Sequence, residues 1–330
     1  MSRLTYLAQR MLRMDYAAML RTARMLHEKT GKPTAWLLAD MARCASQYGA
    51  GYVDYKIAEM YRLTPEQRAT QITRAASNRI VASMNDKAYW HHFDDKAEFN
   101  TLFAEQVRRD WIDLRKAAPE AFAVWADGRG AVMGKPMEGS SGQGIVKYAK
   151  GELPALEEIR ASGIDLLEDY VIQHEDLQAL CPTSVNTLRI ATLLGDKQQG
   201  VVYACIRIGN GSVVDNVDQG GMAAPIDLQT GRLRAVGADK LGNRYEQHPA
   251  TGVTIPGFQI PYWQEAKEMA LEAMQVIPQV RFVAWDVAIT PEGPVFIEGN
   301  SFPSHAIPQF AAHYPDGIGI LPRFREFIDF

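Results

Sequence analysis

The chain has 330 residues, of which 47% are hydrophobic and 22% are charged, so it can form a large core or several smaller lobes. The formal net charge of −4 argues against a nucleic-acid-binding protein. The sequence contains no run of about 18 apolar residues, which argues against a membrane-spanning helix. The cysteines, Cys44, Cys181 and Cys205, form no CxxC pair, which disfavours a zinc site or a disulfide framework. The first residues lack the apolar segment of a secretory signal, so we expect a cytoplasmic protein.

The first 85 residues are expected to be helical. They are rich in Ala, Met, Arg, Leu and Gln, and Thr64 followed by Pro65 is typical of a helix start. Residues 1–32 carry seven Lys or Arg against two acids, with apolar residues at roughly helical spacing. The favoured interpretation is a helix that docks on the rest of the chain with a solvated basic face. The alternative is a peripheral contact with an anionic membrane, at its inner face.

The pattern changes after residue 85. Asp94 and Asp95 predict the start of a helix that runs to about Ala118. Short apolar segments follow, rich in β-branched and aromatic residues and separated by Gly, Asp and Pro, which indicates antiparallel strands. A helical pattern from Glu265 to about Val276 lies between two of them. The expected fold class is therefore α+β.

Acidic side chains interrupt an apolar pair of strands near the C-terminus. Strands at about 283–289 and 294–298 are joined by a Pro-Glu-Gly turn and should form an antiparallel hairpin. Asp286 lies on the first strand, while Glu298 and Asn300 end the second on one face. Two carboxylates and an amide oxygen are ligands that Mg²⁺ or Mn²⁺ prefers. The alternative is an ordinary strand end with solvated acids.

A Gly- and Ser-rich segment follows Lys135. Its candidate phosphate-binding residues are Gly139, Ser140, Ser141, Gly142 and Gly144. Backbone amides and hydroxyls in such a loop can surround a phosphate, and Lys135 adds positive charge. The segment is not a Walker A loop, and a flexible hairpin loop is the alternative. Another lysine, Lys96, opens the helix predicted after Asp95, although a lone lysine there is usually only solvated.

A third candidate is the apolar strand at 166–172, which contains Glu168 and Asp169 and precedes Glu175. The backbone at such a strand end can bond the edge of an adenine, and a later Glu can bind ribose hydroxyls. Considered alone, a partly exposed edge strand is the more frequent interpretation.

Other reactive residues form no recognisable site. Ser184, Ser301 and Ser304 lack the surroundings of a nucleophile elbow. His91 and His92 lack partners at metal-ligand spacing. His305 is a candidate for a substrate pocket, although a structural histidine is the favoured interpretation.

The order of these motifs resembles that of the ATP-grasp superfamily. A lysine, a second lysine with a glycine-rich loop, a hinge with Glu, and Asp followed by Glu-x-Asn occur in turn over residues 86–315. The carboxylate spacing is similar to that of the ribosomal-protein glutamate ligases. The chain most resembles the sugar-transfer-associated ATP-grasp proteins, through the following segments: Asn85-Asp86, Asp95-Lys96-Ala97-Glu98-Phe99, Asn186-Thr187-Leu188-Arg189, and Asp215-Asn216 with Gly220-Gly221.

The resemblance implies an ATP-grasp fold in which two α+β lobes hold ATP between them. Residues 1–85 would form a helical region in place of the usual αβα domain. Residues 86–170 would form the nucleotide-clamping lobe, and residues 171–330 the metal- and substrate-binding lobe.

The resemblance also implies a role for each candidate residue. Lys96, or Lys87 as its competitor, would bind ATP phosphates together with Lys135 and the loop. Glu168 and Val171 would contact adenine through their backbones, and Glu175 would bind the ribose. Asp286, Glu298 and Asn300 would hold two Mg²⁺ ions. Arg189 and Arg207 would meet the transferring phosphate or a substrate carboxylate, and Asn216 would belong to a substrate-side loop.

The implied activity is a carboxylate–amine ligase that forms an amide through an acyl phosphate. Its substrates would be a small-molecule carboxylate and an amine, and the family context suggests a sugar acid in polysaccharide or glycoconjugate biosynthesis. Two alternatives stay open. One is an ATP-grasp kinase that phosphorylates a hydroxyl, and the other is a non-catalytic nucleotide-binding scaffold.

Overall fold

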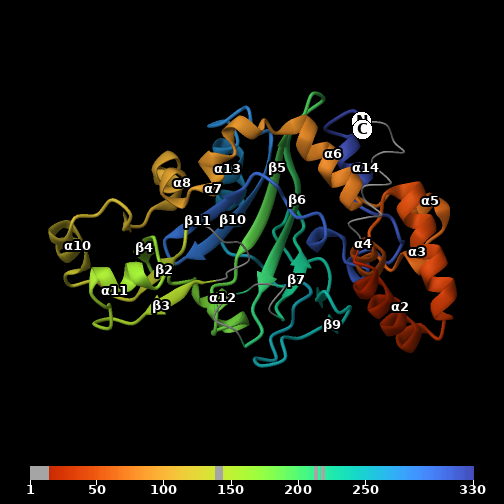
Figure 1. The fold of residues 1–330 in the computed structure, drawn as a ribbon, viewed down its shortest axis with the longest axis horizontal. Coiled ribbons are helices and arrows are strands. Elements are labelled where there is room, and N and C mark those ends of the chain that lie inside the picture. Colours follow the sequence, from red (N-terminus) through yellow and green to blue (C-terminus); the bar gives the residue numbers. More distant parts are fainter. Residues whose placement is uncertain (1–14, 138–143, 212–214, 216, 218–219) are drawn as a thin grey trace. The chain divides into compact units, whose positions relative to one another are not determined.

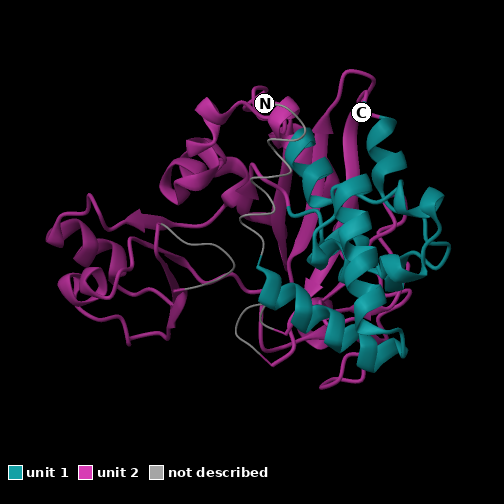
Figure 2. Cartoon of the chain, turned by 45° about the vertical axis from the view of Figure 1, so that its right-hand side comes forward, with its two compact units in different colours: residues 1–80, 304–326, 330 teal, residues 81–303, 327–329 magenta. Residues whose placement is uncertain are grey.

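The computed structural model describes residues 15–137, 144–211, 215, 217 and 220–330. Contacts divide the chain into two compact units, shown in Figure 2. Unit 1 comprises residues 1–80, 304–326 and 330, and unit 2 comprises residues 81–303 and 327–329. The functional division at residues 85 and 170 remains a prediction.

Among the described residues, no helix combines the length and the apolar character that a membrane span needs.

Unit 1 is helical, which confirms the prediction for the front of the chain. Its elements are α2 (Tyr16–Thr30), α3 (Thr34–Tyr48), α4 (Tyr52–Ile57), η1 (Met60–Arg62), α5 (Pro65–Arg68), most of α6 (Arg74–Met84), η4 (Ile307–Gln309), η5 (Ala311–His313) and α14 (Leu321–Arg325). Gly31 and Gly49 end α2 and α3 in the left-handed conformation, at φ 72° and 66°. Leu26, Leu37 and Tyr55 belong to the buried core of these helices. The first part of the predicted basic helix, residues 1–14, lies outside the described residues.

The C-terminal segment bonds to the helices of unit 1. Gln309 accepts a hydrogen bond from the Ile72 N–H at 2.6 Å and donates one to the Ile72 carbonyl at 2.7 Å. His305 Nε2 lies 2.7 Å from Asp54 Oδ1. This contact within unit 1 favours the structural interpretation of His305.

Unit 2 contains a small four-stranded antiparallel sheet (Figure 1). Its strands are β1 (Trp111–Asp113), β2 (Val132–Lys135), β3 (Val146–Tyr148) and β4 (Leu166–Asp169), in the order β1-β4-β2-β3. The helices α10 (Pro119–Ala126) and α11 (Leu156–Ala161) contribute Phe122 and Ile159 to its hydrophobic core. This sheet holds Lys135 and Glu168 on neighbouring strands.

The larger sheet of unit 2 has seven antiparallel strands in the order β11-β10-β5-β6-β7-β8-β9. They are β5 (Leu188–Leu194), β6 (Gln199–Ile208), β7 (Met222–Pro225), β8 (Gly237–Ala238), β9 (Arg244–Tyr245), β10 (Phe282–Thr290) and β11 (Gly293–Asn300). The helices that the structure describes in the rest of this unit are η2 (Lys87–Tyr89), α7 (His91–Asp94), α8 (Lys96–Leu102), α9 (Ala104–Val107), α12 (Glu175–Leu180) and α13 (Trp263–Ala273). Phe99 and Phe103 pack against Trp285 and Phe296, whose rings stack 4.9 Å apart, and thereby join α8 to the sheet.

The prediction that this helix runs to about Ala118 is wrong. Asp95 caps α8 as predicted, by accepting hydrogen bonds from the N–H groups of Ala97 and Glu98. The helical stretch ends with α9, because Arg108 adopts a left-handed conformation at φ 52°. Residues 111–113 then form β1, which pairs with β4.

Candidate active site

The predicted hairpin of β10 and β11 is present and brings the three candidate metal ligands together. Asp286 lies opposite Glu298, and Ala284 lies opposite Asn300, whose Nδ2 donates to the Ala284 carbonyl at 3.3 Å. Asn85 holds the base of the hairpin, since its Nδ2 donates to the carbonyls of Phe282 at 2.7 Å and Ser301 at 2.6 Å.

Two arginines bind the carboxylate of Asp286. Arg189 lies opposite Asp286 on β5, and its Nε and Nη2 donate to Oδ1 and Oδ2 at 2.5 and 2.9 Å. Arg207 on β6 donates from Nη2 to Oδ2 at 2.8 Å. Asp286 is fully buried, so two positive charges on one carboxylate compensate its desolvation.

The two facing carboxyls have opposite pKa shifts. Burial alone would raise the pKa of Asp286, but the charges of Arg189 and Arg207 outweigh it and lower the pKa to about 2. Burial and the negative charge of Asp286 raise the pKa of Glu298. A hydrogen bond between the two side chains adds to both shifts. A bound divalent cation would favour the ionised form of both carboxyls, because metal ligands must be deprotonated.

A hydroxyl and another carboxyl fix Arg207. Thr187 Oγ1 accepts hydrogen bonds from Arg207 Nε at 2.9 Å and Nη2 at 2.6 Å. Asp215 accepts bonds from the Thr187 N–H at 2.8 Å and from its hydroxyl, and lies 3.5 Å from Arg207 Nε. Burial raises the pKa of Asp215 despite the nearby arginine. The guanidinium is therefore held in one orientation beside Asp286.

On the smaller sheet, Glu168 binds Lys135 and Arg109. Lys135 Nζ lies 2.5 Å from Glu168 Oε1, and Arg109 Nη2 lies 2.9 Å from Oε2. Burial would raise the pKa of Glu168, but these two cations lower it to about 2. Arg109 Nη1 also donates to the Phe296 carbonyl of β11. Arg109 thus links the small sheet to the edge strand of the large sheet.

Lys96 lies close to both groups of charges. Its Nζ donates to the Met137 carbonyl at 2.9 Å. Burial lowers the pKa of Lys96 and the charge of Lys135 lowers it further, against the opposing effect of Glu298. Lys87 is exposed and lies over the Trp90 ring, at 5.6 Å from its centroid. Lys96 is therefore the lysine that meets the other charged groups.

We call these residues the charged cluster. Its cations are Lys96, Arg109, Lys135, Arg189 and Arg207, and its carboxyl groups are Glu168, Asp215, Asp286 and Glu298. Five cations facing four carboxyls leave no excess of negative charge. Because Mg²⁺ in proteins usually keeps one or two carboxylates and adds substrate phosphates, this balance suits a Mg²⁺–triphosphate complex better than the bare ion.

A cavity of about 710 Å³ lies in unit 2, beside residues 169–172 at the end of β4. Arg109, Tyr170, Val171 and Val295 are among its lining residues. This volume is within the range of small-molecule sites. Arg109 belongs both to this cavity and to the charged cluster, whereas Lys96, Lys135, Asp286 and Glu298 do not line it.

The remaining candidate residues differ in burial, and several of them lie outside the described residues. Val171 is half-buried, and Glu175 is exposed at the start of α12. Gly144 has φ 73°, a conformation that favours glycine. The other candidate residues of the loop, Gly139, Ser140, Ser141 and Gly142, lie outside the described residues, as does Asn216.

Two features of this site were not predicted from the sequence. One is the side chain of Glu168, which joins the charged cluster from β4, opposite Trp111 and Met133; the expected contact of its backbone with adenine stays a prediction. The other is Arg109, which follows a left-handed residue in a segment expected to be helical. Only the charge of Glu168 on an apolar strand hinted that a cation must face it.

Comparison with known proteins identifies the family. Residues 153–327, more than half of the chain, match the sugar-transfer associated ATP-grasp family. This match confirms the resemblance stated from the sequence. No curated protein sequence matches the chain.

Three solved structures illustrate the similarity. ATP-grasp ligase PsnB, complexed with a phosphomimetic variant of minimal precursor, Mg and ADP, is 14% identical with a TM-score of 0.40, over 72% of this chain and 60% of that chain. The D-alanine–D-alanine ligase from Coxiella burnetii is 11% identical with a TM-score of 0.42, over 72% and 56%. D-cycloserine synthetase DcsG is 12% identical with a TM-score of 0.42, over 84% and 80%. The chain therefore covers less than two thirds of the length of the first two proteins. The chain belongs to the sugar-transfer associated ATP-grasp family and has the ATP-grasp fold.

Proposed function

We propose that this chain is an ATP- and Mg²⁺-dependent ligase that joins a carboxylate to an amine through an acyl phosphate. One observation carries the proposal. Asp286 and Glu298 face each other on the hairpin, beside Arg189 and Arg207, and Lys96 lies near Glu298. Oxygen ligands for a divalent ion and cations for phosphate groups thus occur in one cluster.

The donor set suits Mg²⁺. Asp286, Glu298 and Asn300 supply carboxylate and amide oxygens, which Mg²⁺ and Mn²⁺ prefer. Burial and the charge of Asp286 raise the pKa of Glu298, and a divalent cation bound between the two carboxyls would favour their ionised forms. Bound with ATP, Mg²⁺ would neutralise charge on the transferring phosphoryl group.

Four cations of the cluster would have a task in this reaction. Lys96 and Lys135 would bind phosphate oxygens, and Glu168 positions Lys135 through their 2.5 Å contact. Arg189 and Arg207 would orient the substrate carboxylate toward the γ-phosphate and neutralise its charge. The carboxylate oxygen then forms a bond to phosphorus while ADP leaves. Attack of the amine on the acyl carbon gives the amide and releases phosphate and a proton.

The proposed carboxylate substrate is a sugar acid, within polysaccharide or glycoconjugate biosynthesis; the family description supports an association with sugar transfer. A uronic acid would offer its carboxylate to the two arginines, and its hydroxyls would need polar groups around them.

The test is an ADP-release assay with purified protein, Mg·ATP and pools of sugar acids and amino acids. The ligase proposal expects ADP formation that depends on an acid, and a hydroxamate when hydroxylamine replaces the amine. A phosphorylated product that resists hydroxylamine would show a kinase instead. ATP binding without ADP release in any pool would favour a non-catalytic protein.

A further inference from the structure

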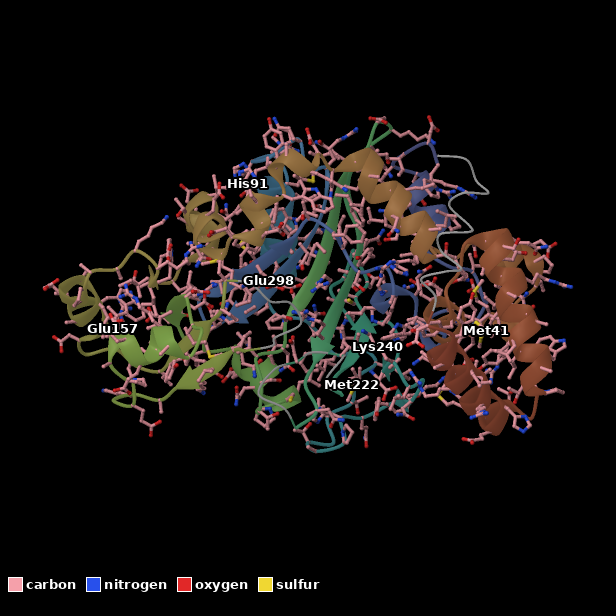
Figure 3. All side chains as sticks on the ribbon, in the orientation of Figure 1. Met41, His91, Glu157, Met222, Lys240 and Glu298 are labelled. Atoms are coloured by element: carbon pink, nitrogen blue, oxygen red, sulfur yellow. The ribbon has the colours of Figure 1, made fainter. Side chains whose placement is uncertain are left out.

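Two imidazoles and a carboxylate meet at the corner between α7 and α8, apart from the charged cluster. His91 Nε2 lies 3.6 Å from Glu98 Oε1, and His92 Nδ1 lies 2.6 Å from the same oxygen. All three atoms lie within 4.8 Å of one another. Figure 3 labels His91 at this corner and Glu298 on β11. The turn at Asp95 brings Glu98 back onto the two histidines.

These distances are close to those of a tetrahedral zinc site. Metal–ligand distances of about 2.1 Å place neighbouring ligand atoms about 3.4 Å apart. The separation between His91 and Glu98 already agrees with this value, and the contact between His92 and Glu98 has to open by less than about 1 Å. The side chains of His91 and Glu98 are 57% and 36% exposed, so the carboxylate can move and an ion can enter.

The local fold holds the corner in place without a metal. Asp95 accepts hydrogen bonds from Ala97 N–H at 2.9 Å and from Glu98 N–H at 3.0 Å. Its other oxygen lies 2.8 Å from Arg115 Nη1. The rings of His91 and His92 lie side by side, with centroids 4.0 Å apart. Pre-positioned ligands lower the entropy that metal binding costs.

The sequence offered these histidines no partner at metal-ligand spacing, but the fold brings Glu98 to both of them. We propose that His91, His92 and Glu98 bind one divalent cation of the zinc class. Two imidazole nitrogens and one carboxylate favour zinc over Mg²⁺, which prefers oxygen ligands. Three protein ligands leave the fourth position of the ion to water or an external ligand. Because α8 begins at Lys96, the ion ties α7 to the helix that carries this lysine of the charged cluster. The site is independent of the proposed ligase activity.

The test is a Zn²⁺ titration of untagged, full-length protein against a chromophoric chelator. We expect one tightly bound ion per chain, no displacement by millimolar Mg²⁺, and at least a tenfold loss of affinity in Glu98→Gln and in the double variant His91→Ala/His92→Ala. His27→Ala is the matched control, because it removes an exposed imidazole that bonds the Lys32 carbonyl. It should keep the wild-type affinity.

A second readout separates metal binding from misfolding. Zn²⁺ should raise the unfolding temperature of the wild type and of His27→Ala, but not that of Glu98→Gln. Absence of stoichiometric Zn²⁺ binding to the wild type would overturn the proposal, because the three side chains would then only share hydrogen bonds. Equal affinity in the double variant would also overturn it.

Discussion

Of the two carboxyls proposed as metal ligands, Glu298 is the one whose pKa is raised. It faces Asp286, and burial together with that negative charge raises its pKa. Glu298→Gln keeps the shape and one oxygen ligand but loses the charge. We predict that ADP release falls by about 100-fold or more, since metal-based charge stabilisation is worth several kcal/mol.

The same substitution should leave folding nearly unchanged, because Gln also removes the unfavourable contact between two carboxylates. Thermal unfolding checks this point beside the ADP assay. Full activity in Glu298→Gln would remove this residue from the metal site.

The affinity for nucleotide should fall at alkaline pH, because Lys96 loses its positive charge there. Burial and Lys135 lower its pKa, so its positive charge is lost at a lower pH than in an exposed lysine. Phosphates favour the charged form, and affinity for Mg·ATP should be constant below this pKa and fall above it. We predict that Lys96→Arg, which stays charged, shifts this fall to higher pH in calorimetric titrations between pH 7 and 10. Identical pH profiles for both proteins would contradict the assignment of Lys96 to the phosphates.

At the scale of elements, Glu168 holds β2 and β4 to the edge of the large sheet through Lys135 and Arg109. Glu168→Gln leaves two cations in a buried place without their anion. We predict a loss of about 3–5 kcal/mol in the free energy of unfolding at pH 7, measured with urea.

The pH dependence of this effect has a definite sign. The pKa of Glu168 is lowered from 4.5 to about 2, so its stabilising effect is complete above about pH 4.5 and is lost as the pH falls towards 2. The difference between wild type and Glu168→Gln should therefore narrow in acid. A constant difference from pH 7 to pH 3 would show that the charge of Glu168 is not the cause.

Elements whose information is local were predictable from the sequence. The β10–β11 hairpin was expected because its turn, its alternating apolar residues and its carboxylate spacing all lie within about 20 residues. The start of α8 at Asp95 was expected for the same reason. In contrast, β1 depends on pairing with β4, more than 50 residues away, so its residues looked helical. Arg189 and Arg207 were candidate site residues in the sequence, but their contact with Asp286 could not be predicted. Strand pairing brings both arginines to Asp286.

At the scale of the whole molecule, segments from both ends of the chain form one compact unit. Residues 304–326 belong to the same compact unit as the N-terminal helices. The hydrogen bonds between Gln309 and the backbone of Ile72 join residues 237 positions apart. No local pattern in the sequence could show this contact, because both segments look like ordinary helical or irregular chain.

Substitution of Gln309 tests how much the packing of residues 304–326 with the N-terminal helices stabilises unit 1. It is 4% exposed, and Gln309→Ala would leave the N–H and carbonyl of Ile72 without these partners in a buried place. We predict a loss of about 1–3 kcal/mol in the free energy of unfolding. Gln264→Ala is the control, since Gln264 makes an exposed bond to the Gln229 carbonyl and its loss should cost little. Equal effects of the two substitutions would contradict the prediction.

We propose that the charged cluster binds a nucleoside triphosphate together with Mg²⁺. Calorimetric titration of the full chain with a non-hydrolysable ATP analogue, with and without Mg²⁺, tests it most directly. We predict one nucleotide per chain, binding that weakens strongly when Mg²⁺ is chelated, and little heat from Mg²⁺ alone. No binding, or binding that is unaffected by both chelation and Glu298→Gln, would contradict it.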